Sequence, residues 1–398
     1  MNASIPAPGE ALRIAIVGCG VIGTLHAEVA AASPDLHVVA VVDPIAERTE
    51  KLAHLLTGTE TGTASQPPRR YADLDEALAH GGLDVVTVCT PSGTHAALAG
   101  QALEAGLHVV VEKPLDADLV AARALHAAAA TRPEQMVSVI SQHRHDPSAM
   151  AIHEALEQGR LGRVTSAVAN VDWYRKQAYY DSGDWRGTWA QDGGGALANQ
   201  GIHTLDLLLW FLGEPLEVFA YTARLGHERI DVEDVAVAVI RFTSGALATV
   251  HASTTVYPDL GVRLGIHGTD GSAVIEGDLL SYFHARDAEG AAWVANQVGA
   301  QEDENKNVLG GFDPAGSHTS QYGDSHALQW ADVVRAIRSG GQPWVGLDHG
   351  LNALATVRAI YLSATLGQPI RVAEVLAGDY DGVPVRTGQV PQASQTSG

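Results

Sequence analysis

The chain has 398 residues, of which 46% are hydrophobic and 18% charged, as expected of a globular protein with two or three domains. Its 46 acidic and 25 basic residues give a formal net charge of −21, and such a surface repels nucleic acid and anionic membranes. The sequence has no signal-peptide pattern and no apolar run long enough to span a membrane. Cys19 and Cys89 show neither metal-ligand spacing nor a pairing pattern, so we expect a cytoplasmic protein with reduced thiols.

The first motif is a glycine-rich turn. Residues 1–11 are expected to be disordered, and residues 13–17 predict a buried strand. The glycines that follow fit G-x-G-x-x-G: the first allows a tight turn, the second lets a pyrophosphate approach, and the third lets helix pack on strand. The helix N-terminus then presents free N–H groups to the phosphates. The residues expected to bind them are Gly18, Gly20, Val21, Ile22 and Gly23.

An acidic residue after the second strand indicates which cofactor this domain binds. The run 37–43 predicts a buried strand that ends at Asp43, 20 residues after Gly23 (43 − 23). A carboxylate there accepts hydrogen bonds from the adenine ribose and repels a 2′-phosphate, which favours NAD over NADP. Arg48 lies close enough in sequence to weaken that preference. A Rossmann-like domain that binds no dinucleotide is the alternative.

Strand and helix patterns alternate as far as about residue 145, which indicates a parallel sheet with helices on both faces. We therefore expect a dinucleotide-binding Rossmann domain over residues 12–145. Ligands of such a sheet lie at the carboxyl ends of its strands. The residues there that are expected to contact the cofactor are Asp43, Thr90, Pro91, His95, Glu112, Lys113 and Gln142, together with Arg48.

After residue 145 the pattern changes to strands that follow one another without helices. A helix over 149–162 comes first, and the strands include a hairpin around Ser244 and Gly245. This order predicts a substrate-binding and oligomerisation domain with a largely antiparallel sheet over residues 146–375. Several strands carry small or β-branched residues on both faces, so the free face is expected to pair with another subunit in a homodimer or homotetramer.

The C-terminal part combines two helices with less regular segments. Residues 297–325 are expected to be either a functional lid or a disordered segment. Helices are predicted over 325–341, with Ser325 as N-cap, and over 351–367. The tail 376–398 is expected to be disordered.

The segment 196–212 predicts an apolar helix with a narrow polar stripe. At about 100° per residue, one side carries Asn199, His203, Asp206 and Trp210, and leucines cover the other. No Lys or Arg pairs with the stripe, and glycines 193–195 leave the helix start open to close approach. The stripe is either a buried histidine and aspartate that satisfy each other, or a face that contacts substrate opposite the nicotinamide.

Three motifs together resemble the glucose–fructose oxidoreductase/inositol dehydrogenase/rhizopine catabolism (Gfo/Idh/MocA) family. They are the glycine turn 18–23, the tripeptide Glu112-Lys113-Pro114 and the stretch GGGALANQGIHTLDLL. The likeness runs from about residue 12 to 375. It implies an N-terminal Rossmann domain and a C-terminal α/β domain with a large open sheet. It also implies nicotinamide-dependent oxidation or reduction of a sugar or polyol at a ring carbon.

The resemblance matches the family's lysine to Lys113 and its histidine to His203, and with Asn199 these are the expected catalytic residues. The residue four before that histidine is an aspartate in many members but Asn199 here, and an amide cannot take up a proton. The ANQGIH form is similar to the branch that includes nucleotide-sugar dehydrogenases. Because an unperturbed imidazole titrates near neutral pH and an ammonium far above it, we assign His203 as general base and Lys113 as the group that binds the reacting oxygen. The reverse assignment stays open.

The stretch 173–189 brings six aromatic residues together with basic ones. Aromatic rings stack on sugar rings, and arginines bind carboxylates or phosphates. A core or interface cluster, with Arg186 paired to Asp184, is the alternative. The run His143-Arg144-His145-Asp146 lacks further ligands at the usual spacing, so no metal is expected. The residues expected to bind substrate are Lys113, Arg175, Tyr179, Trp185, Trp189, Asn199, His203 and Asp206.

The sequence therefore predicts an NAD-dependent dehydrogenase, with NADP less favoured, that oxidises a secondary ring hydroxyl of a sugar or sugar derivative. The alternatives are a keto-sugar reductase, an enzyme that keeps its NAD bound and oxidises then re-reduces the substrate, and a non-catalytic dinucleotide-binding sensor. The expected partners are a small sugar or polyol and further copies of the chain, but neither nucleic acid nor membrane.

Overall fold

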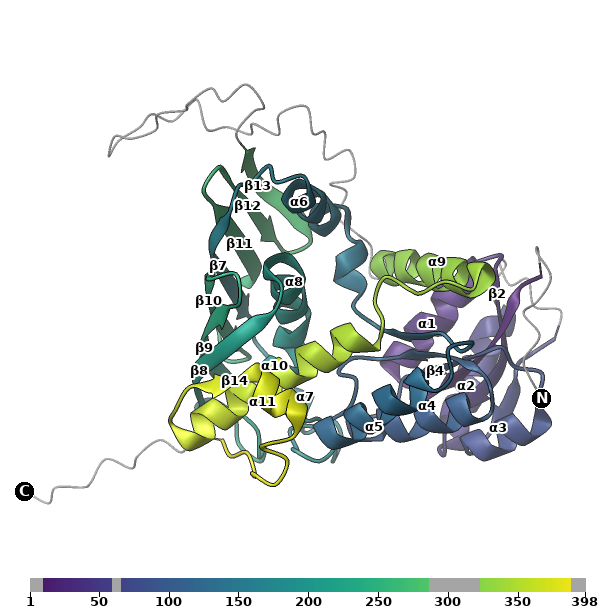
Figure 1. The fold of residues 1–398 in the computed structure, drawn as a ribbon. Coiled ribbons are helices and arrows are strands. Elements are labelled where there is room, and N and C mark those ends of the chain that lie inside the picture. Colours follow the sequence, from purple (N-terminus) through teal and green to yellow (C-terminus); the bar gives the residue numbers. More distant parts are fainter. Residues whose placement is uncertain (1–9, 59–65, 286–322, 388–398) are drawn as a thin grey trace, which may run out of the picture. The chain divides into compact units, whose positions relative to one another are not determined.

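A computed structural model describes residues 10–58, 66–285 and 323–387 (Figure 1). The chain divides into two compact units, each built from three segments. The first unit comprises Met1–Gln142, Ala190–Gly193 and Gln321–Leu354; the second comprises His143–Trp189, Gly194–Ser320 and Ala355–Gly398. The domain ranges expected from the sequence are continuous, and they stay predictions. Of the loop expected over 297–325, residues 297–322 lie outside the described residues.

The first unit contains the predicted parallel sheet. Its six strands have the order β3-β2-β1-β4-β5-β6, and every neighbouring pair is parallel. The strand order reverses between β1 and β4, which is where open α/β sheets bind ligands. The elements are β1 (Leu12–Val17), α1 (Val21–Ala32), β2 (Leu36–Val42), α2 (Ala46–Gly58), β3 (Arg69–Tyr71), α3 (Leu74–His80), β4 (Val85–Val88), η1 (Ser92–Thr94), α4 (His95–Glu104), β5 (His108–Val111), α5 (Leu119–Ala130), β6 (Val137–Val139), the first residue of η2 (Gln142–His145), α9 (Asp324–Ser339) and the start of α10 (Leu347–Leu366); the rest of η2 and of α10 belongs to the second unit.

Apolar side chains of this sheet and of α1 form one core with helix α9. Ile14, Ile16 and Val41 of the sheet pack in the same cluster as Trp330 and Val333 of α9. Burying such side chains is the main favourable contribution to folding. The core therefore holds a helix from beyond residue 320 against the N-terminal sheet. Both cysteines are buried free thiols.

The second unit contains an eight-stranded sheet of order β13-β12-β11-β7-β10-β9-β8-β14. All its pairs are antiparallel except β7 with β10, so the predicted large, mostly antiparallel sheet is confirmed. The hairpin of β9 and β10 turns at Ser244 and Gly245, as predicted. The elements are α6 (Pro147–Glu157), β7 (Val164–Asp172), α7 (Gln177–Tyr180), η3 (Ala196–Gly201), α8 (Ile202–Leu212), β8 (Pro215–Ala223), β9 (Val235–Phe242), β10 (Leu247–Ser253), β11 (Gly261–Gly268), β12 (Gly271–Glu276), β13 (Leu279–Ala285), β14 (Ile370–Arg371) and α11 (Val372–Ala377).

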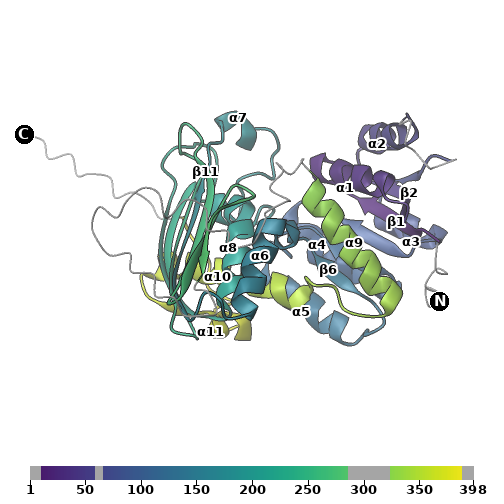
Figure 2. The same cartoon turned by 90° about the horizontal axis from the view of Figure 1, so that it is seen from above.

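One face of this sheet is covered by helices. Figure 2 shows α6 and α8 on the same side of the strands. Buried and exposed residues alternate along β9 and β10, as a half-covered sheet requires. Apolar side chains stand exposed at Tyr221, Val237, Val239 and Leu247. Pairing of a second subunit through the free face stays a prediction.

Two expectations for the C-terminal part are wrong. Gly323, not Ser325, is the N-cap of α9, and no side chain caps that helix. The tail was expected to be disordered from residue 376, but hydrogen bonds attach it to the rest of the unit as far as Thr387. Arg358 donates a hydrogen bond to the Val383 carbonyl at 2.5 Å, and Thr387 Oγ1 donates one to the Asp231 carbonyl at 2.6 Å. Among the described residues, no helix has both the length and the apolar character needed to cross a membrane.

Candidate active site

In the first unit, the glycine turn after β1 leaves the N-terminus of α1 open. Gly18 has φ +96°, and a Cβ there would lie 2.6 Å from the Cys89 carbonyl oxygen, so a side chain does not fit. A Cβ on Gly20, the N-cap of α1, would meet nothing within 4 Å, and no side chain caps the helix. Val21 in the first turn is 78% exposed. Open space in front of unsatisfied N–H groups is what the pyrophosphate of a dinucleotide requires.

Asp43, which follows β2, is fixed beside this turn. Its Oδ2 accepts a hydrogen bond from the Cys19 backbone N–H at 2.9 Å, and its Oδ1 accepts one from Ile45 at 2.9 Å. The carboxylate is buried, and Arg48 Nη1 lies 3.8 Å from Oδ2. Each carboxylate oxygen has more than one acceptor site, so Asp43 can still bind ribose hydroxyls. Its role toward the cofactor stays a prediction.

His95 braces the two loops that follow β4 and β5. Its Nδ1 lies 2.7 Å from the Pro114 carbonyl oxygen and its Nε2 lies 2.8 Å from the Thr90 carbonyl oxygen. Because a carbonyl oxygen only accepts, both ring nitrogens must donate for both bonds to form. His95 is buried and uses both nitrogens on the protein. The contact with cofactor predicted for His95 would therefore act through the loops of Thr90 and Pro114.

Glu112 is enclosed by protein groups and orients Lys113. Trp330 Nε1 donates to His26 Nδ1 at 2.9 Å, which leaves His26 Nε2 to donate to Glu112 Oε1 at 2.9 Å. Glu112 Oε2 accepts from the backbone N–H of Lys113 at 3.1 Å. Burial alone would raise the pKa of Glu112, but the bond from His26 and the charge of Lys113 bring it to about 2. An ionised, fixed carboxylate thus holds the backbone of Lys113, whose own side chain is half-buried.

Gln142 follows β6 and offers a buried acceptor. Its Oε1 has no hydrogen-bond donor among the described residues, although the side chain is buried. A buried amide oxygen without a donor costs free energy. A ligand N–H or hydroxyl would supply that donor, which agrees with the cofactor contact predicted for Gln142.

In the second unit, a π-helical turn, η3, precedes α8 and carries Asn199. The sequence predicted one α-helix over 196–212, but Ala196–Gly201 form a π-helix, whose turns are wider. Between residues 194 and 212, Asn199, His203 and Trp210 are half-buried, and every other residue is buried. The predicted accessible stripe is therefore present except for Asp206.

Asp206 is 4% exposed and pairs with an arginine from outside the helix. Arg144 Nε donates to its Oδ2 at 2.7 Å, and Arg144 Nη2 donates to its Oδ1 at 2.6 Å. The expectation that no Arg pairs with this stripe is wrong. A contact of Asp206 with substrate gains no support from this geometry. Trp210 is covered in part by the His153 ring, whose centroid lies 4.1 Å from its own.

A second imidazole lies beside His203. The rings of His143 and His203 meet edge to face, with centroids 5.3 Å apart. His143 Nδ1 bonds Asp146 Oδ2 at 2.7 Å and lies 3.4 Å from Asp278 Oδ1. Burial lowers the pKa of His143, but these carboxylates outweigh it and leave the pKa raised. The raised pKa favours the charged form of the His143 ring that lies beside His203.

The glycine run before η3 is closed by the protein itself. A Cβ on Gly195 would lie 1.7 Å from the Glu233 carbonyl oxygen, and one on Gly194 would lie 2.2 Å from Tyr361 Oη. The Glu233 carboxylate accepts backbone hydrogen bonds from Gly195 at 2.9 Å and Leu197 at 2.8 Å, and one from Tyr361 Oη at 3.0 Å. Burial raises the pKa of Glu233 to about 7. The predicted close approach of a ligand at these glycines is therefore wrong, because Glu233 and Tyr361 occupy that space.

The aromatic stretch 173–189 divides into two parts. Tyr180 belongs to an apolar cluster with Ile230 and Val232, and Trp189 packs against it and donates Nε1 to the Asp231 carbonyl at 3.1 Å. This part fits the core-cluster alternative. Arg186, in contrast, lies over the rings of Tyr179 and Trp185, and no ion pair with Asp184 forms among the described residues.

Two groups in the described part of the chain have ligand atoms spaced closely enough for a metal ion. They are His26, Glu112 and His326 in the first unit, and His143, Asp146 and Asp278 in the second, with ligand atoms within 4.8 Å of one another. In both groups, hydrogen bonds between the side chains already connect the imidazole with a carboxylate. The expectation of no metal stays a prediction.

Comparisons with known proteins cover both units. Residues 12–141 match an oxidoreductase family with an NAD-binding Rossmann fold, and residues 149–274 match the GFO/IDH/MocA C-terminal domain. Inositol 2-dehydrogenase of Rhizobium meliloti is 26% identical over 376 residues, 91% of this chain and 99% of that protein. scyllo-Inositol 2-dehydrogenase (NAD⁺) of Bacillus subtilis is 30% identical over 279 residues, 66% of this chain and 73% of that protein. The crystal structure of the WlbA dehydrogenase of Bordetella pertussis, with NADH and UDP-GlcNAcA, matches with a TM-score of 0.78 at 31% identity, over 91% of this chain and 98% of that one.

Proposed function

This chain belongs to the Gfo/Idh/MocA family of NAD-binding oxidoreductases, and from that premise we propose that it oxidises a secondary ring hydroxyl of a sugar or sugar derivative to a ketone. The observation that carries the proposal is the position of His203, a half-buried imidazole on a helix whose side chains are otherwise buried, apart from Asn199 and Trp210. Two relatives are inositol dehydrogenases, and a third was crystallised with a nucleotide sugar. These names support a cyclic polyol or a sugar as the substrate.

In this proposal the chain's own residues handle the proton and the oxygen. NAD, when bound, accepts the hydride that leaves the substrate carbon. His203 takes the hydroxyl proton as general base. Lys113 donates a hydrogen bond to the reacting oxygen and stabilises the negative charge that develops on it. Glu112 is a positioning residue, because it binds the backbone N–H of Lys113.

The direct test is a substrate panel with purified protein and NAD. The panel contains free monosaccharides, inositols, anhydro-sugars, glycosides and nucleotide sugars, and NADH formation is followed by absorbance. We expect NADH with at least one structural class and no NADH with acyclic polyols of the same size. Failure of the whole panel, in protein shown by calorimetry to bind NAD, would contradict the proposal.

A further inference from the structure

Two arginines of the second unit lie against one tyrosine ring. The guanidinium carbon of Arg186 is 4.4 Å from the centroid of Tyr179, and that of Arg175 is 5.6 Å from the same centroid. Arg186 also lies 4.4 Å from the Trp185 ring, and Arg175 lies 4.8 Å from the Trp173 ring. Both arginines are half-buried. Aromatic rings thus hold two guanidinium groups together at the protein surface.

Within the described ranges, neither arginine has an acidic partner. Among the described residues, no carboxylate forms an ion pair with Arg175, Arg186 or the neighbouring Lys176, although the chain has 46 acidic and only 25 basic residues. Other arginines of the same unit are neutralised: Arg144 lies 2.6 Å from Asp206, and Arg229 lies 2.8 Å from Asp181. Because Asp181 is paired with Arg229, the stretch 175–186 carries three basic side chains, Arg175, Lys176 and Arg186, against one remaining acid, Asp184. Such a site attracts an anion.

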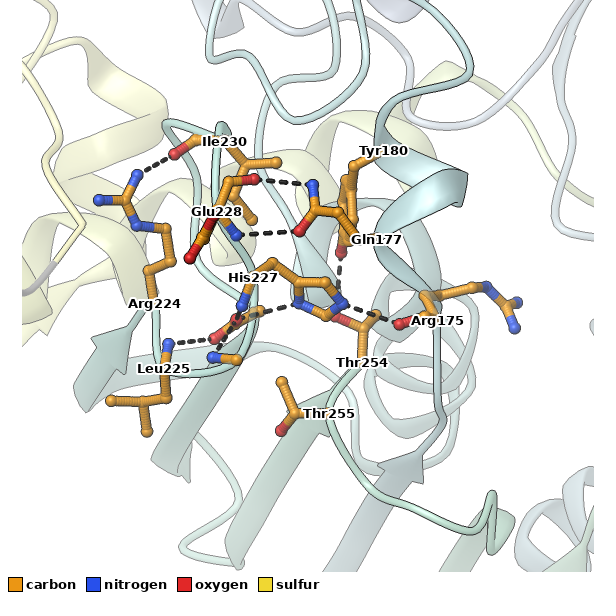
Figure 3. A network of polar contacts seen from close by, with 12 residues as sticks. Arg175, Gln177, Tyr180, Arg224, Leu225, His227, Glu228, Ile230, Thr254 and Thr255 are labelled. Carbon is orange, nitrogen blue, oxygen red and sulfur yellow. Dashed lines mark hydrogen bonds and ion pairs between the residues drawn. The ribbon is translucent and has the colours of Figure 1, made fainter.

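The backbone under Arg175 is fixed by a buried network (Figure 3). His227 Nε2 donates to the Arg175 carbonyl oxygen at 2.8 Å, and His227 Nδ1 donates to Asp234 Oδ2 at 3.0 Å. The Arg175 backbone N–H donates to the Thr254 carbonyl at 2.9 Å. Figure 3 shows the Arg175 guanidinium extending away from this network. The side chain is thus presented from a rigid base, which lowers the entropy cost of binding.

A buried acceptor connects this cluster with the helix of His203. Gln200 Nε2 donates to Tyr179 Oη at 3.1 Å, and Gln200 precedes His203 by three residues. Gln200 is 6% exposed, and its Oε1 has no donor among the described residues. A buried oxygen without a donor is expected to receive one from a ligand, because otherwise its burial costs free energy. The arginine cluster and the unsatisfied Gln200 oxygen independently favour a polar ligand at the same place.

We propose that Arg175 and Arg186 bind an anionic group of the substrate, so that the sugar oxidised by this enzyme carries a carboxylate or a phosphate. The proposal rests on the proposed function and specifies its substrate class. Guanidinium groups match the paired oxygens of carboxylates and phosphates and bind them with charge-assisted hydrogen bonds. The rings of Tyr179, Trp173 and Trp185 give the sugar itself an apolar surface. A neutral sugar would leave both guanidinium groups without an anion.

The test uses matched probes on the full chain loaded with NAD. The pairs are glucuronic acid with glucose, glucose 6-phosphate with glucose, and UDP-N-acetylglucosaminuronic acid with UDP-N-acetylglucosamine. Calorimetry measures binding, and absorbance measures NADH formation. We expect at least one acidic probe to bind at least about 10-fold more tightly than its neutral partner. This difference corresponds to one charged hydrogen bond that the neutral probe cannot form. The first pair reports a carboxylate, the second a phosphate, and the third a carboxylate in the presence of a diphosphate.

Variants assign the effect to the two arginines. Arg175→Met and Arg186→Met should each weaken binding of the preferred acidic probe about 10- to 100-fold and leave the neutral partner nearly unchanged. Arg186→Lys keeps the charge and should lose less. Arg160→Met is the matched control, because Arg160 also lies over an aromatic ring, 5.3 Å from the centroid of Phe283, but outside the cluster. It should not change binding of any probe.

The outcomes separate this proposal from the proposed function. Equal binding of acidic and neutral probes, or equal losses for both in the methionine variants, overturns the anion site. A neutral sugar that yields NADH without any preference for an acidic probe overturns the anion site but leaves the dehydrogenase function standing. Tight, arginine-dependent binding of an acidic probe without NADH from the whole panel supports the anion site and contradicts the proposed function.

Discussion

Arg144 holds Asp206 through two parallel hydrogen bonds, of 2.7 and 2.6 Å, and both side chains are buried. The pair joins the turn η2 to the middle of α8 within the second unit. The Arg144 guanidinium also lies 5.4 Å from the centroid of Trp210 on the same helix. A bidentate pair of this kind satisfies both groups, so Asp206 anchors the helix that presents His203.

Removing one partner of this pair should destabilise the protein. We expect Asp206→Ala to lower the free energy of unfolding by about 3–5 kcal/mol, because it leaves a buried guanidinium unpaired. Denaturant titration with circular dichroism measures this. The double variant Arg144→Met/Asp206→Leu should recover much of the loss, since it removes both charges. Native stability of Asp206→Ala together with a raised KM would instead favour the substrate contact expected from the sequence.

His227 should make stability depend on pH in a defined direction. Burial lowers its pKa, but the hydrogen bonds to Asp234 and to the Arg175 carbonyl outweigh burial and leave it raised above 6.5. A raised pKa means that this stabilisation is complete below about pH 6.5 and is lost as pH rises through the folded-state pKa. His227→Phe should lower the free energy of unfolding by about 1–3 kcal/mol at low pH and by less at high pH.

The measurement for His227 is the free energy of unfolding of wild type and variant at several pH values. Asp234 also contributes, because its pKa is lowered and its stabilisation disappears as pH falls through that value. The comparison therefore belongs above that acid range. A difference between the two proteins that is constant or grows with pH would contradict a charged His227.

Much of the fold follows from local patterns. Glycine spacing at 18–23 and alternating apolar runs predict the parallel sheet, and successive strand patterns without helices between residues 216 and 277 predict the antiparallel one. β3, at Arg69–Tyr71, has three residues, two of them basic and exposed, and so carries no strand pattern. The accessible positions of Asn199 and His203 were also predictable, because they interrupt an otherwise apolar helix.

The errors come from partners that are distant in sequence. Arg144 lies 62 residues before Asp206, and a helical projection contains no information about it. Glu233 lies 38 residues after Gly195, and its carboxylate binds the start of η3, where the sequence suggested space for a ligand. Its signal in the sequence was three acids, Asp231, Glu233 and Asp234, beside an apolar run. Buried acids of this kind require partners, so such runs deserve the same scrutiny as catalytic motifs.

Asp43 should control the choice of cofactor. Asp43→Asn keeps an acceptor for the Cys19 N–H but removes the negative charge that repels a 2′-phosphate. We expect the ratio of kcat/KM for NADP to that for NAD to rise about 10-fold or more. A change of this size corresponds to the free energy of one charge-assisted hydrogen bond. Steady-state kinetics with both cofactors measures this ratio. A wild-type protein that already prefers NADP would show that the ribose assignment is wrong.

Lys113 should act on turnover rather than on cofactor affinity. A group that stabilises developing negative charge acts mainly in the transition state. Lys113→Ala should lower kcat about 10²- to 10³-fold, while the Kd for NAD measured by fluorescence changes little. Lys51→Ala, at an exposed position of α2, is the control and should match wild type. Unchanged turnover of the Lys113 variant with the true substrate would exclude this role.

His203 should carry the acid limb of the pH profile. His203→Ala removes the base from a half-buried position, so we expect an intact fold and a roughly 10²–10⁴-fold lower kcat/KM. The acid limb of kcat/KM against pH should vanish in the variant, because that limb reports the free enzyme's base. His153→Ala is the control. It alters the packing of Trp210, which lies on the same helix as His203, and it should keep the acid limb. Asn199→Asp adds a carboxylate four residues before the histidine and should move the limb to higher pH. If His203→Ala keeps both its activity and its acid limb, His203 is a structural residue, and Lys113 becomes the leading candidate for the base.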